Sequence, residues 1–102
     1  MRDFNEFVDM SNEIYLDMEL NNLATEADTL LATIYHCIDN YTKDICMDKL
    51  TESLILRYAF IDLSNKAMLA NNYTVDDYAQ VYVVELDCIA SKLRNKYNEL
   101  NY

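Results

Sequence analysis

Residues 74–100 read TVDDYAQVYVVELDCIASKLRNKYNEL. The apolar side chains in this stretch recur at steps of three and four: Val75, Ala79, Tyr82, Leu86, Ile89, Leu93, Tyr97 and Leu100. This spacing places them on one face of an α-helix. Thr74 and Asp77 have the spacing of an N-terminal capping pair. Four residues, Val81–Val84, have strand-like propensity, but the longer periodicity outweighs them. The stretch therefore predicts a helix with one buried face.

Two further helices are predicted upstream. Residues 45–70 contain an apolar stripe that consists of Met47, Leu50, Leu54, Tyr58, Ile61 and Met68. Ile55 and Phe60 lie on the two flanks of this stripe. Residues 25–38 have a similar apolar stripe: Ala27, Leu30, Leu31, Ile34 and Ile38. Thr25 and Asp28, at the start of this segment, have the spacing of an N-terminal capping pair.

Asparagine takes the place of glycine and proline at the expected helix ends. Asn can adopt the left-handed backbone conformation and competes for local hydrogen bonds, so it can end a helix. We expect breaks at Asn21-Asn22, at residues 39–42 and at residues 71–73.

The first twenty residues have two apolar faces. Phe4, Phe7, Val8, Tyr15 and Met18 cluster on one side of a helix. A nearly opposite side carries Leu16, Leu20, Leu23, Ala27, Leu30 and Ile34. One straight helix cannot turn both faces toward one core. We favour a break at Asn21-Asn22, which gives four helices. The alternative is three helices with an apolar face left over, and that face would need a partner, most simply a second copy.

Composition excludes several classes of protein. The chain has 102 residues, enough for one domain (residues 1–102). It contains no Gly and no Pro, which excludes glycine-rich phosphate loops and dinucleotide fingerprints. Its formal charge is −10, and this disfavours direct binding to nucleic acid or to an anionic membrane. Neither a signal peptide nor an apolar stretch of membrane-spanning length is evident, so we expect a cytoplasmic protein.

The sequence does not favour catalysis or metal binding. The single histidine, His36, adjoins Cys37, and neighbouring residues on a helix point about 100° apart. The cysteines, Cys37, Cys46 and Cys88, lack the spacing of zinc ligands, and we interpret them as small core residues. No calcium loop or di-metal motif is present. We therefore predict a non-enzymatic protein without a cofactor or metal.

The acidic residues are concentrated near the start of the chain. Residues 1–28 hold eight acids against Arg2 alone. Glu6, Asp9, Glu13 and Asp17 step by three and four, and this set is called the acidic ridge below. Such a ridge is either an ordinary solvated face or a surface for a basic partner. The predicted partner-binding residues are Asp3, Glu6, Asp9, Glu13, Asp17 and Tyr15.

In overall profile the chain resembles the small acidic proteins that phages direct against host nucleic-acid machinery, such as anti-CRISPR and anti-restriction DNA mimics. No motif carries this resemblance. It implies an all-α inhibitor or regulator that occupies the basic surface of a nucleic-acid-binding protein, in the host cytosol if the chain is phage-encoded. The alternative is a self-associating, homodimeric helical protein without mimicry.

Overall fold

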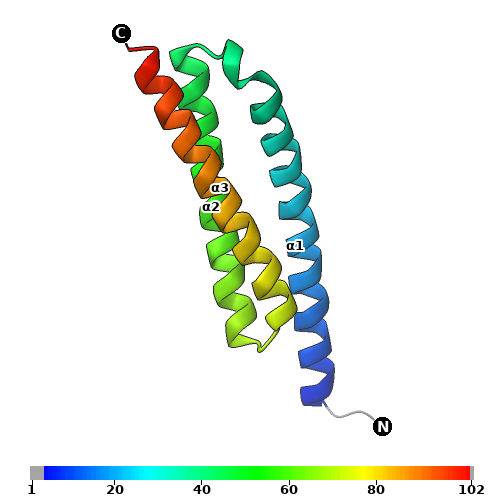
Figure 1. Ribbon diagram of the computed structural model, residues 1–102. Helices are drawn as coiled ribbons and strands as arrows, with labels where there is room; N and C mark the ends of the chain where they lie inside the picture. Colours follow the sequence, from blue (N-terminus) through cyan, green and yellow to red (C-terminus); the bar gives the residue numbers. More distant parts are fainter. Residues whose placement is uncertain (1–3, 102) are drawn as a thin grey trace.

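The computed structural model describes the backbone of residues 4–101 and the side chains of residues 13–101. In this part of the chain the structure consists of helices, without a strand: α1 (Phe4–Cys37), a 3-10 helix η1 (Ile38–Asn40), α2 (Lys43–Leu69) and α3 (Tyr73–Glu99). Consecutive α-helices run antiparallel (Figure 1). The predicted all-α antiparallel bundle is confirmed, with three helices.

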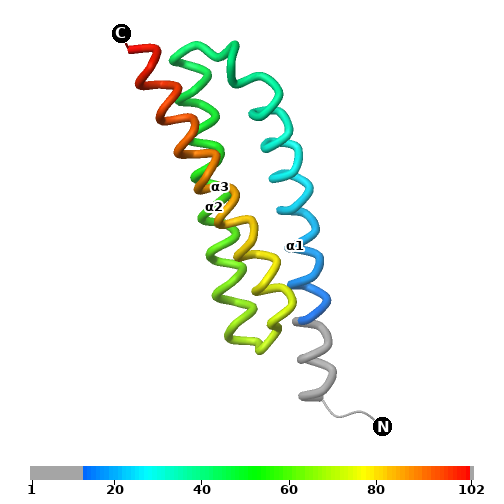
Figure 2. The backbone as a smooth tube through the Cα atoms, in the orientation of Figure 1, coloured from blue at the N-terminus to red at the C-terminus, as the bar shows by residue number. Residues whose placement is uncertain are grey.

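α1 is one continuous helix through Asn21 and Asn22, so the favoured break there is wrong and the three-helix alternative is confirmed (Figure 2). The reason is the apolar stripe that begins at Leu16, because its steps of four and three continue across the asparagines without a change of face. Thr25 is not a cap. Its hydroxyl donates to the carbonyl of Asn21, 2.9 Å away, within the helix.

The turn between α2 and α3 is built from asparagine, as predicted. Asn71 has a φ of 55°, the left-handed conformation that usually requires glycine. The amides of Asn71 and Asn72 donate to the carbonyls of Met68 and Ala67, at 3.1 and 2.8 Å. This pair of bonds is a Schellman motif.

The start of α3 lies earlier than the sequence indicated. The side chain of Asn72, not that of Thr74, accepts a hydrogen bond from the first turn, with 3.2 Å to the amide of Val75. At the other break, residues 39–42, η1 leads to Thr42, whose hydroxyl caps α2 by accepting from the amide of Ile45 at 3.3 Å.

The core contains the predicted faces of α1 and α3. Leu16, Ala27, Leu30, Leu31 and Ile34 are buried on α1. On α3 the predicted face is buried at Val75, Ala79, Leu86, Ile89 and Leu93, and half-buried at its other three positions.

The predicted stripe of α2 is displaced. The buried residues of α2 are Cys46, Ser53, Phe60, Leu63, Ser64 and Ala67. Of the predicted stripe, Met47, Tyr58 and Met68 are exposed and the others are half-buried. The real inner face is centred about 100° away around the helix axis. Phe60, expected at the flank, lies at its centre and stacks on Tyr82 with 4.7 Å between ring centroids.

The molecule is a rod with principal extents of 67 × 18 × 16 Å. α2 and α3 make most of the contacts between helices, and α1 packs against both. The N-terminal half of α1, the C-terminal half of α2 and the N-terminal half of α3 lie at the same end of the rod (Figure 1).

Candidate functional site

Two of the predicted partner-binding carboxylates, Glu13 and Asp17, lie one turn apart on α1 and are exposed. Among the described side chains, no Lys, Arg or His nitrogen lies within 4 Å of either carboxylate. Asp3 lies outside the described residues, and the side chains of Glu6 and Asp9 lie outside the described side chains. The described half of the acidic ridge is therefore exposed and not neutralised by a neighbouring base.

Tyr15 is not on the same side of α1 as these carboxylates. It lies two residues from each of them, which is about 200° around the helix axis. Tyr15 lines an open groove between α1 and α2, together with Leu16, Lys66, Leu69 and Ala70. The structure thus separates Tyr15 from Glu13 and Asp17, although all three residues belong to the same half of α1.

Glu19 differs from Glu13 and Asp17 because it is paired. Its Oε1 lies 3.8 Å from Nζ of Lys66, which also lies 3.1 Å from Oδ2 of Asp62. The hydrogen bond to Asp62, with the charge of Glu19, raises the pKa of Lys66. This three-residue network joins α1 to α2 near the end of the bundle.

Asp28 joins α1 to α3. Its Oδ1 accepts a hydrogen bond from the hydroxyl of Tyr82 at 2.8 Å. Partial burial, followed by this hydrogen bond, raises the pKa of Tyr82 to about 12. Glu85, one turn further along α3, contributes to the same rise through its charge. Asp28, Tyr82 and Glu85 therefore lie close together where α1 faces α3.

A shallow groove of about 250 Å³ runs between α1 and α3 beside this group. Its walls are Leu20, Asn21, Ala24, Tyr78 and Tyr82. Asp17 precedes this segment on α1 and Asp28 follows it. On α3, Asp77 and Glu85 bracket Tyr78 and Tyr82 in the same way. The groove thus has tyrosine in its walls and carboxylates along both helices.

The net charge is segregated along the rod. We call residues 13–30 and 58–85 the acidic half, and residues 31–57 and 86–101 the balanced half. The acidic half has nine acids and one base, Lys66, a net charge of −8. The balanced half has six acids and six bases, a net charge of zero. Residues 1–12 contribute the remaining −2. The entire excess charge of the described side chains therefore lies in the acidic half.

Five carboxylates of the acidic half make no ion pair and no side-chain hydrogen bond with another described side chain: Glu13, Asp17, Glu26, Asp77 and Glu85. All five are exposed. Sequence reasoning missed the two on α3, because their proximity to α1 depends on how the helices pair. The signal that could have found them is the turn at residues 71–73, which folds α3 back along α2.

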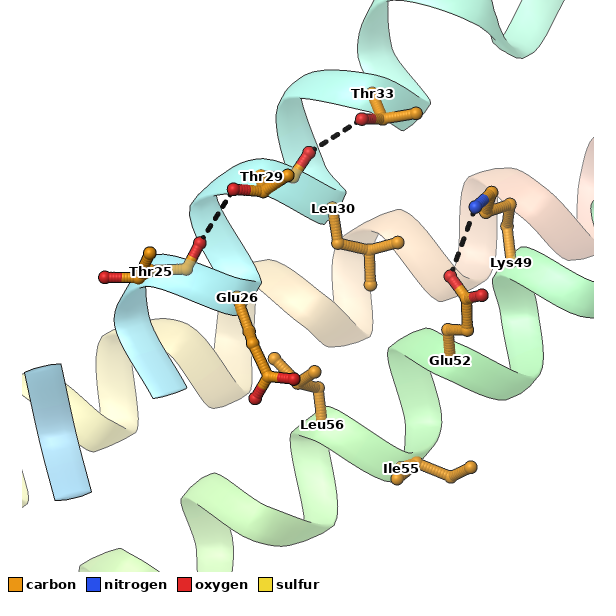
Figure 3. Close-up of a pocket in the computed structure, with 9 residues that line it drawn as sticks. All are labelled: Thr25, Glu26, Thr29, Leu30, Thr33, Lys49, Glu52, Ile55 and Leu56. Carbon is orange, nitrogen blue, oxygen red and sulfur yellow. Dashed lines mark hydrogen bonds and ion pairs between the residues drawn. The ribbon is translucent and has the colours of Figure 1, made fainter. Parts of the chain in front are cut away.

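A groove of about 590 Å³ lies between α1 and α2 (Figure 3). Thr25, Thr29 and Thr33 form one wall, and each hydroxyl donates to the carbonyl four residues earlier, at 2.8–2.9 Å. Lys49 on the opposite wall pairs with Glu52 at 3.2 Å. With the threonine hydroxyls and the Lys49–Glu52 pair already bonded, the groove offers methyl groups, aliphatic side chains and the unpaired carboxylate of Glu26. The aliphatic side chains are those of Leu30, Ile55 and Leu56.

The three cysteines have different surroundings. Cys46 is buried, and burial raises the pKa of its thiol. Cys37 is half-buried, and Cys88 is exposed, so the core interpretation is wrong for Cys88. Among the described residues, no three His, Cys, Asp or Glu side chains gather as potential metal ligands.

None of the helices formed by residues 4–101 is apolar over a length that could cross a lipid bilayer. Comparisons with protein-family models, with curated proteins and with solved structures found no match.

Proposed function

We propose that this protein is a non-catalytic interaction module whose acidic half occupies the basic surface of a nucleic-acid-binding protein. The observation that carries the proposal is the density of charge. Residues 13–30 of α1 span about 26 Å at 1.5 Å per residue. Residues 13–30 carry five of the nine acids, and residues 58–85 of α2 and α3, which lie beside them, bring the net charge of the acidic half to −8. Over the length of the acidic half this is one charge per about 3 Å of the rod, close to the one per 3.4 Å of a single DNA strand.

A basic protein fits this surface better than other partners do. Nucleic acid and anionic lipid carry the same sign of charge and are repelled. A groove lined by Lys and Arg is attracted over a long range, and this attraction raises the rate of association. The rigidity of the three helices holds the carboxylates in place before binding, which lowers the entropy lost on association.

Tyrosine and apolar side chains in the acidic half support contact beyond charge. Tyr78 lies in the α1–α3 groove, and Ile14, Tyr15 and Met18 are exposed on α1. Tyr is enriched in protein interfaces, where it adds contact area at low conformational cost. We therefore include Tyr15 in the binding surface, on a side distinct from that of Glu13 and Asp17.

The proposed action is inhibition or regulation by occupancy. The partner surface that normally binds DNA or RNA is covered, and no covalent step is required. This mode of action matches the phage anti-CRISPR and anti-restriction mimics that the chain resembles in profile. We place it in the cytoplasm, in the host cytosol if the chain is phage-encoded, where nucleic-acid-binding proteins are abundant.

The test is capture of proteins from a lysate of the source cell on the immobilised chain, at low and at high salt. The wild type is expected to retain nucleic-acid-binding proteins at low salt, and duplex DNA is expected to displace them. The triple variant Glu13→Lys, Asp17→Lys, Glu85→Lys should lose them, because it reverses charge on both helices of the α1–α3 groove.

The matched control is Asp39→Lys, Asp48→Lys, Glu99→Lys. It changes the net charge by the same amount, at exposed positions in the balanced half. If this control retains the nucleic-acid-binding proteins and the first variant loses them, the result would support a binding surface in the acidic half. Equal loss of the captured proteins in both variants would mean that binding depends only on net charge. Retention in both variants, or a failure of duplex DNA to displace the captured proteins, would contradict mimicry.

A further inference from the structure

α2 has a second apolar face on the outside of the molecule. Seven residues form it, and we call them the outer stripe: Met47, Thr51, Leu54, Tyr58, Ile61, Asn65 and Met68. No member of the outer stripe is charged. Leu54 and Ile61 are half-buried, and the other five are exposed. Three of the six side chains that the sequence assigned to the core of α2, those of Met47, Tyr58 and Met68, are therefore exposed on its surface.

The outer stripe carries larger side chains than much of the inner face. Tyr58 is 67% exposed, Met68 54% and Met47 44%. The inner face includes Ser53 and Ser64, which are fully buried or nearly so. An uncharged apolar surface of this length on a small protein is typical of an interaction site.

The spacing of the outer stripe identifies the kind of occupant. The steps along it are 4, 3, 4, 3, 4 and 3, which is the repeat of a helix that packs against another helix. The stripe covers 22 residues, about 32 Å of helix. An extended peptide or a small ligand would use only part of it, whereas a second helix of similar length would cover all of it.

The order of residues along the outer stripe identifies that helix. The stripe reads almost the same in both directions about Tyr58. In an antiparallel pair of α2 helices, Met47 would face Met68, Leu54 would face Ile61, and Thr51 would face Asn65. Apolar residues then meet apolar residues and polar residues meet polar ones, as a two-fold interface between identical surfaces requires.

We infer that a second copy of this chain covers the outer stripe, with the two α2 helices antiparallel and in contact at Tyr58. Charge favours the same arrangement. Parallel packing would place two acidic halves, each of charge −8, side by side. Antiparallel packing places each acidic half beside the balanced half of the other copy, which holds six of the chain's eight bases.

The dimer leaves the proposed partner-binding surface free. α2 contacts α1 through residues outside the outer stripe, among them Lys66, which pairs with Glu19, and Leu56 in the α1–α2 groove. α1 and the α1–α3 groove are therefore not covered. The dimer would present one acidic half at each end. This surface differs from the N-terminal face of α1, which the sequence had suggested for self-association.

The first test is sedimentation equilibrium of the full chain from about 1 to 200 μM. The wild type is expected to be a dimer at the upper concentrations. Tyr58→Glu should be monomeric throughout, because two carboxylates would meet on the two-fold axis. Val81→Glu is the matched control, since Val81 is 56% exposed on α3 and lies outside the outer stripe. Circular dichroism verifies that both variants are helical.

A wild type that stays monomeric over the whole range, or a Tyr58→Glu variant that dimerises as the wild type does, would overturn the inference. So would equal loss of the dimer in the Val81→Glu control.

The second test determines the direction of packing. Met47→Cys and Met68→Cys are made separately in a Cys37→Ser, Cys88→Ser background, which removes the half-buried and the exposed native thiols. With a short bis-maleimide, a mixture of the two variants should cross-link efficiently and each variant alone should not. Cross-linking of either variant with itself would show a parallel pair and would contradict the antiparallel dimer.

Discussion

The same dipeptide, Asn-Asn, occurs in two places with opposite outcomes. At Asn71-Asn72 the chain turns, with Asn71 in the left-handed conformation and Asn72 capping the next helix. At Asn21-Asn22 the chain continues as an unbroken helix. The local propensity of asparagine is the same in both cases, so the difference must come from the surroundings.

The apolar pattern on either side makes the difference. Leu16, Leu20, Leu23 and Ala27 continue on one face across Asn21-Asn22, and that face packs on the other two helices. A break there would remove part of this face from the core. Beyond Ala67 no further residue of α2 is buried, and Met68, Leu69 and Ala70 are exposed. Tertiary packing overrides propensity in α1, and without such packing asparagine ends α2.

Proline gives the largest contrast between the two sites. Asn22→Pro should destabilise the protein by about 3 kcal/mol or more, because proline removes a hydrogen bond inside a helix and clashes with the preceding turn. Tyr73→Pro should cost less than about 1 kcal/mol, since Tyr73 is the first residue of α3, a position where proline is tolerated. Urea unfolding followed by circular dichroism measures both free energies of unfolding.

If α1 were broken in solution, Asn22→Pro would be as mild as Tyr73→Pro. That result would restore the four-helix arrangement.

The contrast also shows how far sequence reasoning reaches. The buried face of α3 is predictable because α3 has one apolar stripe between polar faces. α2 has apolar residues on two sides, and periodicity alone cannot rank them. The inner side is selected by pairing with α3: Phe60 stacks on Tyr82, and the hydroxyl of Ser64 donates to Asp76 and accepts from Gln80. Such contacts between helices are not encoded in the pattern of one helix.

The candidate site was predictable only in part. The acidic ridge follows from spacing within α1, and the structure shows its described members, Glu13 and Asp17, exposed. The contribution of Asp77 and Glu85 depends on α3 lying beside α1, which required the three-dimensional arrangement. The position of Tyr15 on another side of α1 follows from the helix itself, since two residues correspond to about 200°.

The left-handed residue gives the second prediction. Asn71→Ala should destabilise the protein by about 1 kcal/mol, because a β-carbon without a polar group disfavours positive φ. Asn71→Gly should be neutral or slightly stabilising, since glycine adopts this conformation freely. Asn21→Ala serves as the matched substitution in a helix interior and should not destabilise. Equal effects of Ala at positions 71 and 21 would mean that the turn does not depend on the left-handed residue.

The third prediction concerns the hydrogen bond between Tyr82 of α3 and Asp28 of α1, which lies after Asn21-Asn22 in the sequence. Tyr82→Phe keeps the ring that stacks on Phe60 and removes the hydrogen bond to Asp28, which should cost about 1 kcal/mol at neutral pH. The pKa of the Tyr82 hydroxyl is 10.0 in the unfolded chain and about 12 in the folded protein. The folded state therefore holds this proton more tightly than the unfolded state does, and protonated Tyr82 contributes to the free energy of unfolding. This contribution is fully present below pH 10 and is lost as the pH rises toward 12.

The difference in unfolding free energy between wild type and Tyr82→Phe should therefore shrink over that pH range. The other tyrosines are common to both proteins and cancel in the comparison. A difference that stays constant from pH 9 to 12 would show that Tyr82 titrates alike in the folded and unfolded states.

The smallest expected effect comes from replacing the second asparagine of each pair, Asn22 or Asn72, with alanine. Asn22→Ala should stabilise the protein by a few tenths of a kcal/mol, because alanine has the higher helix propensity and the Asn22 side chain is exposed in the helix. Asn72→Ala should instead destabilise by about 1 kcal/mol, since it removes the acceptor for the amide of Val75. The opposite signs matter more than the magnitudes, because a common error in the unfolded-state reference would shift both values in one direction. If Asn22→Ala were destabilising, Asn22 would be acting as a helix cap, and α1 would have to end there.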